Sequence, residues 1–95
     1  MAYRVVWSAR ALADTDAIAS YIAADSSSYA STVVRKILSQ TRVLADFPLA
    51  GRTVPEFGDE NLREVFAYSY RIIYQVGQAE IVVVAIIHGK RTLQD

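Results

Sequence analysis

The stretch from Leu62 to His88 constrains the fold most, because it has the composition and spacing of three consecutive β-strands joined by two short turns. Val, Ile, Tyr and Phe dominate it, as is typical of a pleated, half-buried surface. In the middle segment the even positions from 70 to 76 share one face, and Arg71 lies on the other. The apolar run Ile81–Ile87 predicts an interior strand covered at least in part on both faces. Such a meander is not stable alone, so the preceding chain must cover one face.

The preceding chain predicts one strand and two helices. Residues Tyr3–Trp7 form a short β-branched and aromatic run, and Ser8 after it is a good N-cap. The segment from Ala9 to Ala24 is rich in alanine with apolar residues at helical spacing, and Tyr29 to Ala45 carries a second apolar stripe. Leu49 to Asn61 is expected to be a loop, because glycine and proline punctuate it.

The resulting order is β-α-α-β-β-β, which predicts an α+β two-layer sandwich with a helical hairpin packed on an antiparallel sheet. The 95 residues predict a single domain over 1–95, because a chain of this length builds one core. In the first helix, Asp14 and Asp16 are expected on the outer side. The polar tail from Gly89 to Asp95 is expected to be loosely held.

Composition excludes several classes of site. Ten Lys and Arg balance ten Asp and Glu, so no overall basic field points to nucleic acid. The chain has no Cys and one His, which predicts no disulfide and no metal site. Nothing in the sequence hints at an organic cofactor, so none is expected. We find no signal peptide pattern and no apolar run of the roughly 20 residues that span a bilayer. The cytoplasm is therefore the expected compartment, with no membrane contact.

The candidate functional residues are basic and gather near the end of the last predicted strand. His88, Lys90 and Arg91 lie there, Arg71 lies one strand away, and two more arginines, Arg52 and Arg63, precede them. Arginines beside a His or Lys can hold a phosphodiester and stabilise its charge. The alternative is that they are ordinary surface charges paired with nearby Glu and Asp. Arg71 lies inside an apolar strand and needs a partner or a purpose, so the sequence supports a structural ion pair and a functional site equally.

Taken together, these segments resemble the RelE/ParE superfamily of type II toxin–antitoxin toxins over nearly the whole chain. The resemblance is carried by motifs in a shared order and spacing, which are Val5-Val6-Trp7-Ser8, Leu44-Ala45-Asp46-Phe47-Pro48, Gly51-Arg52, Val54-Pro55-Glu56, Arg63-Glu64, Tyr70-Arg71-Ile72-Ile73-Tyr74, and Val83 to His88 with Arg91. The resemblance implies a toxin that a small antitoxin, encoded beside it, neutralises in a hetero-oligomeric complex.

The superfamily divides by mechanism. RelE-like members cut mRNA on the ribosome with a set of basic residues and a tail Tyr. Here Arg71 and Lys90-Arg91 match that set, but Glu64 follows Arg63 where a Lys is wanted, and the tail has no Tyr. ParE-like members inhibit DNA gyrase and block replication, and many stabilise plasmids. The incomplete basic set and the loop around Gly51-Arg52 favour the ParE-like branch.

Three hypotheses follow from this resemblance. A ParE-like gyrase inhibitor that arrests growth would make no covalent chemistry, and it would use Lys90, Arg91 and Arg52 as contact residues. A RelE-like endoribonuclease would use Arg71 and Arg91 on the scissile phosphate, with His88 or Arg63 assisting proton transfer. A decayed toxin would keep antitoxin binding alone.

Overall fold

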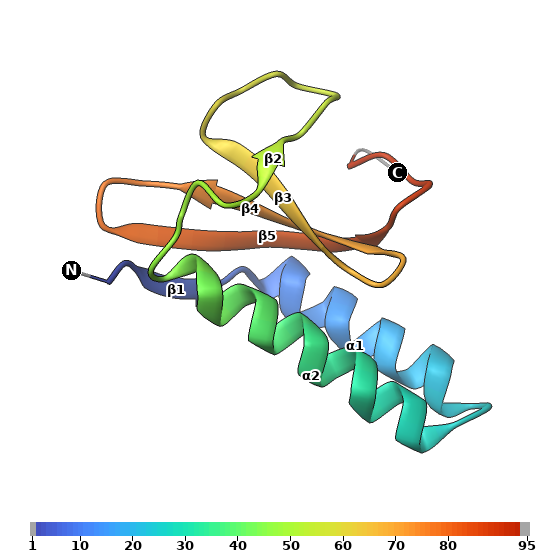
Figure 1. Cartoon of the computed structure of the whole chain (residues 1–95). Helices are drawn as coiled ribbons and strands as arrows, with labels where there is room; N and C mark the ends of the chain where they lie inside the picture. The colour runs from blue at the N-terminus through green and yellow to red at the C-terminus, as the bar shows by residue number, and fades with distance from the viewer. Residues whose placement is uncertain (1, 94–95) are drawn as a thin grey trace.

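Two helices lie on one face of a five-stranded sheet in the computed structural model, which describes residues 2–93 (Figure 1). In chain order the elements are β1 (Arg4–Trp7), α1 (Ala9–Ala23), α2 (Ser27–Leu44), β2 (Arg52–Thr53), β3 (Leu62–Ala67), β4 (Tyr70–Val76) and β5 (Glu80–His88). Across the sheet the order is β1-β5-β4-β3-β2. The predicted α+β fold is confirmed. The expected loop contains one addition, the two-residue strand β2, which pairs with β3.

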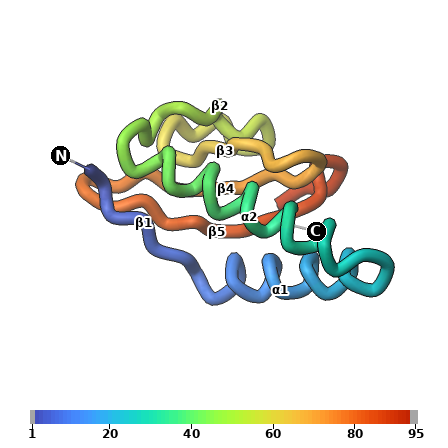
Figure 2. Tube along the Cα trace, turned by 60° about the horizontal axis from the view of Figure 1, so that its bottom comes forward, coloured from blue at the N-terminus to red at the C-terminus, as the bar shows by residue number. Residues whose placement is uncertain are grey.

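The sheet is mixed rather than purely antiparallel. The meander β3-β4-β5 is antiparallel as predicted, but β1 runs parallel to β5, with Arg4 opposite Glu80 and Trp7 opposite Val83. No hairpin joins β1 to β5, because the helices and the rest of the sheet separate them in the chain. The direction of β1 is therefore set by tertiary packing and not by a local turn. Figure 2 shows β1 and β5 running side by side beneath the rest of the sheet.

Serine hydroxyls begin both helices. The Ser8 Oγ accepts a hydrogen bond from the Ala11 N–H at 3.0 Å, as the predicted N-cap requires. The Ser26 Oγ accepts one from the Tyr29 N–H at 3.1 Å, so α2 begins at Ser27, two residues before the predicted start. Among the described residues, no helix has the length and apolar content to cross a membrane.

The main core lies between the helices and the sheet. It is made of small and branched side chains from α1, α2 and three strands, which are Ala11, Val33, Ile37, Ala67, Ile72, Val83 and Ile86. A smaller cluster of Leu44, Tyr74 and Ile81 extends it toward the start of β5. Burial of this apolar surface is what holds the hairpin on the sheet.

A β-bulge in β5 brings side chains from both halves of the strand onto the face that packs against the helices. Ile73 pairs with Ala85, whereas the next residue, Tyr74, pairs with Val83, so Val84 is the extra residue. Because side chains alternate between faces, an unbroken strand would put Val83 and Ile86 on opposite faces. With the bulge, both face the helices.

The opposite face of the sheet has its own apolar cluster. Val54, Ile73, Ala85 and Ile87 are buried there, and Leu93 of the C-terminal tail packs against them. The prediction that β5 is covered on both faces is confirmed. The prediction of a loosely held tail is wrong as far as Leu93, because its side chain joins this cluster; Gln94 and Asp95 lie outside the described residues.

Candidate functional site

Arg71 lies on β4, on the face away from the helices, and its guanidinium is saturated. Its Nε donates to Glu64 Oε1 at 2.7 Å. Its Nη1 donates to Glu56 Oε2 and to the Arg91 carbonyl, both at 2.9 Å. Its Nη2 donates to Glu56 Oε1 at 2.9 Å and lies 2.6 Å from Glu64 Oε1. The guanidinium therefore donates four hydrogen bonds, and all three of its nitrogens are engaged with protein oxygens.

Glu64 is the centre of this cluster and is buried. It lies on β3, diagonal to Arg71, because Arg71 pairs directly with Phe66. On its other side Glu64 pairs with Arg52 of β2, whose Nε lies 2.6 Å from Glu64 Oε2. The exposed Arg52 guanidinium also lies over the Phe66 ring, 5.5 Å from its centroid. Each oxygen of the buried carboxylate therefore has its own arginine.

Glu56 closes the cluster from the loop between β2 and β3, through a bidentate pair with Arg71. The hydrogen bonds from Arg71 lower the pKa of the Glu56 carboxyl, more than partial burial raises it. The hydrogen bonds to Glu56 also raise the pKa of Arg71, and this effect is larger than the lowering that burial causes. We name Arg52, Glu56, Glu64 and Arg71 the ionic cluster. Its two positive and two negative charges cancel.

Arg63 does not join the ionic cluster, although the sequence suggested that Arg63 and Arg71 lie in the same region. It pairs with Tyr74, so its side chain lies on the helix face of the sheet. There its Nη1 donates to the Gly51 carbonyl and its Nε to the Glu60 carbonyl, each at 2.8 Å. The side chain thus holds the loop that precedes β3.

Gly51 is held closely against the sheet in the same place. Its N–H donates to the Tyr74 hydroxyl at 2.9 Å, and that hydroxyl donates to the Pro48 carbonyl at 2.8 Å. A Cβ on Gly51 would lie 2.4 Å from the Glu64 carbonyl oxygen, so only glycine fits. Burial is the main cause that raises the pKa of the Tyr74 hydroxyl, which stays protonated as a donor.

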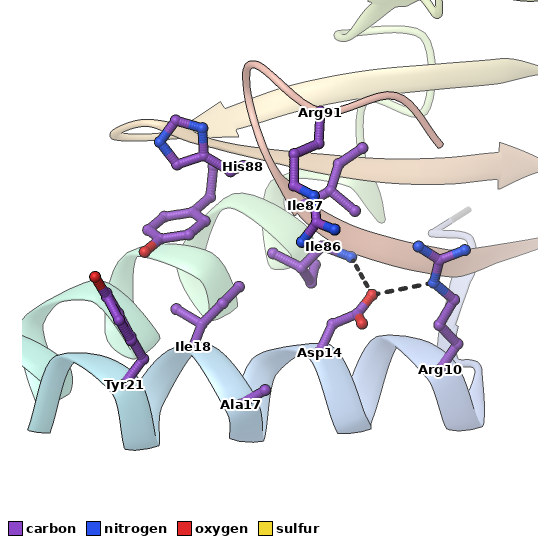
Figure 3. A pocket seen from close by; sticks show the side chains of 10 residues that line it. Arg10, Asp14, Ala17, Ile18, Tyr21, Ile86, Ile87, His88 and Arg91 are labelled. Atoms are coloured by element: carbon purple, nitrogen blue, oxygen red, sulfur yellow. Dashed lines mark hydrogen bonds and ion pairs between the residues drawn. The ribbon is translucent and has the colours of Figure 1, made fainter. Parts of the chain in front are cut away.

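His88 and Arg91 line a different site, a pocket of about 460 Å³ between α1 and the end of β5. The His88 ring meets the Tyr70 ring edge-on at 5.9 Å, and its Nδ1 accepts from the Lys90 N–H at 3.3 Å. Figure 3 shows Arg91 extending from the tail toward α1. Within residues 2–93 no carboxylate pairs with the Arg91 guanidinium. The structure therefore brings the side chains of His88 and Arg91 together in one pocket. Arg71 contacts Arg91 only through the backbone carbonyl of Arg91, and Arg63 lies elsewhere.

Asp14 and Arg10 of α1 form the floor of this pocket. Asp14 Oδ2 accepts from the Ile86 N–H at 3.0 Å and lies 3.4 Å from Arg10 Nε (Figure 3). The expectation that Asp14 lies on the outer side of the helix is wrong, since it caps the open edge of β5 beyond the end of β1. Arg10, Asp14 and Tyr21 are site residues that were not predicted from the sequence. Their helical spacing, which puts them on one face of α1, was the available signal.

The family of the chain follows from its sequence match. Residues 5–93 match the family model described as "ParE toxin of type II toxin-antitoxin system, parDE". The chain belongs to this toxin family. Among solved structures, a chain of the chromosomal ParDE toxin–antitoxin system from P. aeruginosa shares 22% identity with this toxin, at a TM-score of 0.74. The alignment covers 90% of this toxin and 95% of that chain, and the likeness shows a common fold. No curated protein sequence matches the toxin.

Membership confirms the prediction of a type II toxin of the ParE-like branch, and such a toxin implies an antitoxin partner. Of the residues that the resemblance singled out, Arg71 and Arg52 lie in the ionic cluster, and Arg63 binds loop carbonyls. Among the described residues, no group of three or more His, Asp or Glu could hold a metal ion. The exposed cations that remain near the end of β5 are Lys90 and Arg91.

Proposed function

We propose that this toxin arrests growth by binding DNA gyrase in the cytoplasm and blocking replication, without cutting nucleic acid, until its antitoxin binds it. The saturation of Arg71 is the observation that carries the proposal. A catalytic arginine needs N–H groups free to meet the scissile phosphate, whereas Arg71 donates four hydrogen bonds to protein oxygens and is paired with two carboxylates.

The energetics favour the paired state of Arg71. Breaking a buried ion pair costs about 3–5 kcal/mol, because a charge is left buried without a partner. A hydrogen bond to a charged group contributes about 1.5–3 kcal/mol. A phosphate would therefore have to make several such bonds to Arg71 before it could displace Glu56 and Glu64.

The residues proposed to contact gyrase are Lys90 and Arg91, with the sheet edge at Arg52 as a second contact. Both tail residues are exposed, and the carbonyl of Arg91 is fixed by Arg71 at 2.9 Å. The ionic cluster thus positions the turn that presents them. Exposed arginines on a fixed backbone are suited to a protein contact, since arginine is enriched at binding hot spots.

Two assays with the purified toxin, run side by side, test this proposal. One measures supercoiling of relaxed plasmid by gyrase, and the other probes translated mRNA for cuts at the ribosomal A site. We expect inhibited supercoiling and intact mRNA. Cut mRNA with normal supercoiling would overturn the proposal in favour of an endoribonuclease. If supercoiling is normal and mRNA is intact, while the protein still binds its antitoxin, the result would identify a decayed toxin.

A further inference from the structure

A second hollow continues the pocket that His88 and Arg91 line. It has a volume of about 290 Å³ and shares Tyr21, Tyr70 and His88 with that pocket. Together the two hollows form a continuous groove along α1, from Arg10 to the turn between β3 and β4. We call it the tyrosine groove and define it by Arg10, Tyr21, Tyr68, Tyr70, His88 and Arg91.

The aromatic end of the tyrosine groove is open to solvent. Tyr21 is 79% exposed and Tyr68 is 52% exposed. The ring of Tyr68 is tilted against that of Tyr29, with centroids 6.3 Å apart, so the rings form a small aromatic platform. Tyrosine is a large, rigid side chain that is enriched at binding hot spots. A platform of this kind is suited to an apolar side chain of a partner.

The backbone of Tyr68 is strained in the same place. Its φ is +54°, in the left-handed region that favours glycine, and among residues 2–93 no other non-glycine has positive φ. Tyr68 is the first central residue of the two-residue turn between the paired Ala67 and Tyr70, and a tight hairpin turn requires a positive φ there. Glycine and asparagine are favoured at this turn position, and here a tyrosine occupies it and lines the groove with its exposed ring.

The other end of the tyrosine groove carries an excess of positive charge. Arg10 and Arg91 both line it, against the single carboxylate of Asp14. One oxygen of that carboxylate is already occupied by the Ile86 N–H and by Arg10. The charge at this end is complementary to a carboxylate, which an arginine fork binds with two parallel hydrogen bonds.

We propose that the tyrosine groove binds a segment of the antitoxin in which a carboxylate side chain lies near an apolar one. The carboxylate enters between Arg10 and Arg91, and the apolar side chain lies on Tyr21 and Tyr68. This inference rests on the toxin–antitoxin role proposed above. A nucleic acid is a poorer occupant, because the Asp14 carboxylate lies in the groove and the chain as a whole has no net positive charge.

Occupation of the tyrosine groove would also explain how the antitoxin neutralises the toxin. Arg91 is shared between the groove and the surface proposed to contact gyrase. An antitoxin carboxylate bound to Arg91 removes it from that surface. Neutralisation then needs no change in the fold, only competition for one exposed guanidinium.

The test measures the dissociation constant of the toxin for the antitoxin encoded beside it, by calorimetry. Tyr21→Ala and Arg10→Ala are each expected to weaken binding roughly tenfold or more, as hot-spot truncations do. Arg4→Ala is the matched control, because Arg4 is also an exposed arginine paired with one carboxylate, Glu80, but it lies beside the start of β5, at the opposite end of that strand from His88. It should bind as the wild type does. Thermal melting verifies that each variant folds.

The outcomes separate this inference from the gyrase proposal. Inhibition of supercoiling should be unchanged in Tyr21→Ala, since Tyr21 does not belong to the proposed gyrase contact. Arg10→Ala is used for antitoxin binding alone, because Arg10 Nη1 also donates to the Leu93 carbonyl at 3.2 Å, two residues from Arg91. Weakened antitoxin binding supports the groove even if wild-type toxin does not inhibit gyrase. Wild-type affinity in both variants would overturn it. The inference would also be overturned if the two variants lost binding to a single-stranded RNA 20-mer, measured by anisotropy, while their affinity for the antitoxin stayed unchanged.

Discussion

Arg71 and Glu64 form an ion pair across β4 and β3 in which the side chains are 6% and 0% exposed. The pair lies where the related ribosome-dependent nucleases are expected to have a phosphate-binding arginine. In this chain the arginine connects three segments instead, because it also binds the Glu56 carboxylate and the Arg91 carbonyl. The role of the ionic cluster is therefore structural: it stabilises the fold and fixes the position of the C-terminal tail.

Arg71→Met should destabilise the domain by about 3–5 kcal/mol, because it leaves Glu64 buried with only the exposed Arg52 as a partner. The double variant Arg71→Met/Glu64→Leu should lose less, since no charge is then left buried. Urea unfolding followed by circular dichroism measures both. A single variant that keeps wild-type stability but has lost toxicity would identify Arg71 as a functional residue.

Acid should weaken the domain through Glu56. Its pKa is lower in the folded state than the ordinary value of 4.5, because Arg71 hydrogen-bonds the ionised form. The unfolded chain therefore binds the proton more readily, and the stabilisation is present above that value and is lost as the pH falls through the folded pKa. Melting temperatures between pH 3 and pH 7 should fall less steeply on acidification in Glu56→Gln than in the wild type. Parallel curves would contradict this assignment.

Tyr68→Gly should leave the stability unchanged or raise it by up to about 1 kcal/mol, because glycine adopts the positive φ without strain. The same change should weaken antitoxin binding, since it removes a ring from the tyrosine groove. Chemical denaturation and calorimetry measure the two effects. Marked destabilisation would show that Tyr68 serves the fold through its contact with Tyr29.

The elements with a strong repeating pattern could be predicted from sequence. The meander followed from alternation and from β-branched residues, and both helices followed from their apolar stripes, the first of them behind the predicted cap Ser8. The parallel direction of β1 could not be predicted, because no hairpin turn relates it to β5. The bulge at Val84 was also hidden, because a continuous apolar run gives no sign of a change of face.

The candidate site was predicted only in part, for the same physical reason. Arg71 was identified because a charge inside an apolar strand requires a partner, and Glu64 lies one strand away. Glu56 is held by a loop whose path depends on Gly51 against the sheet, and periodicity does not reveal such a path. The Arg10–Asp14 pair was overlooked, because an i,i+4 ion pair on a helix normally faces solvent.

A supercoiling titration with the wild type and Arg91→Ala shows whether this toxin acts on gyrase through its C-terminal tail. We expect the wild type to inhibit gyrase and Arg91→Ala to require roughly tenfold more protein for the same inhibition, because a hot-spot arginine is lost. Stability should be unchanged, because the Arg71 bond is to the Arg91 carbonyl and not to its side chain. Full supercoiling at every concentration of the wild type would contradict the account.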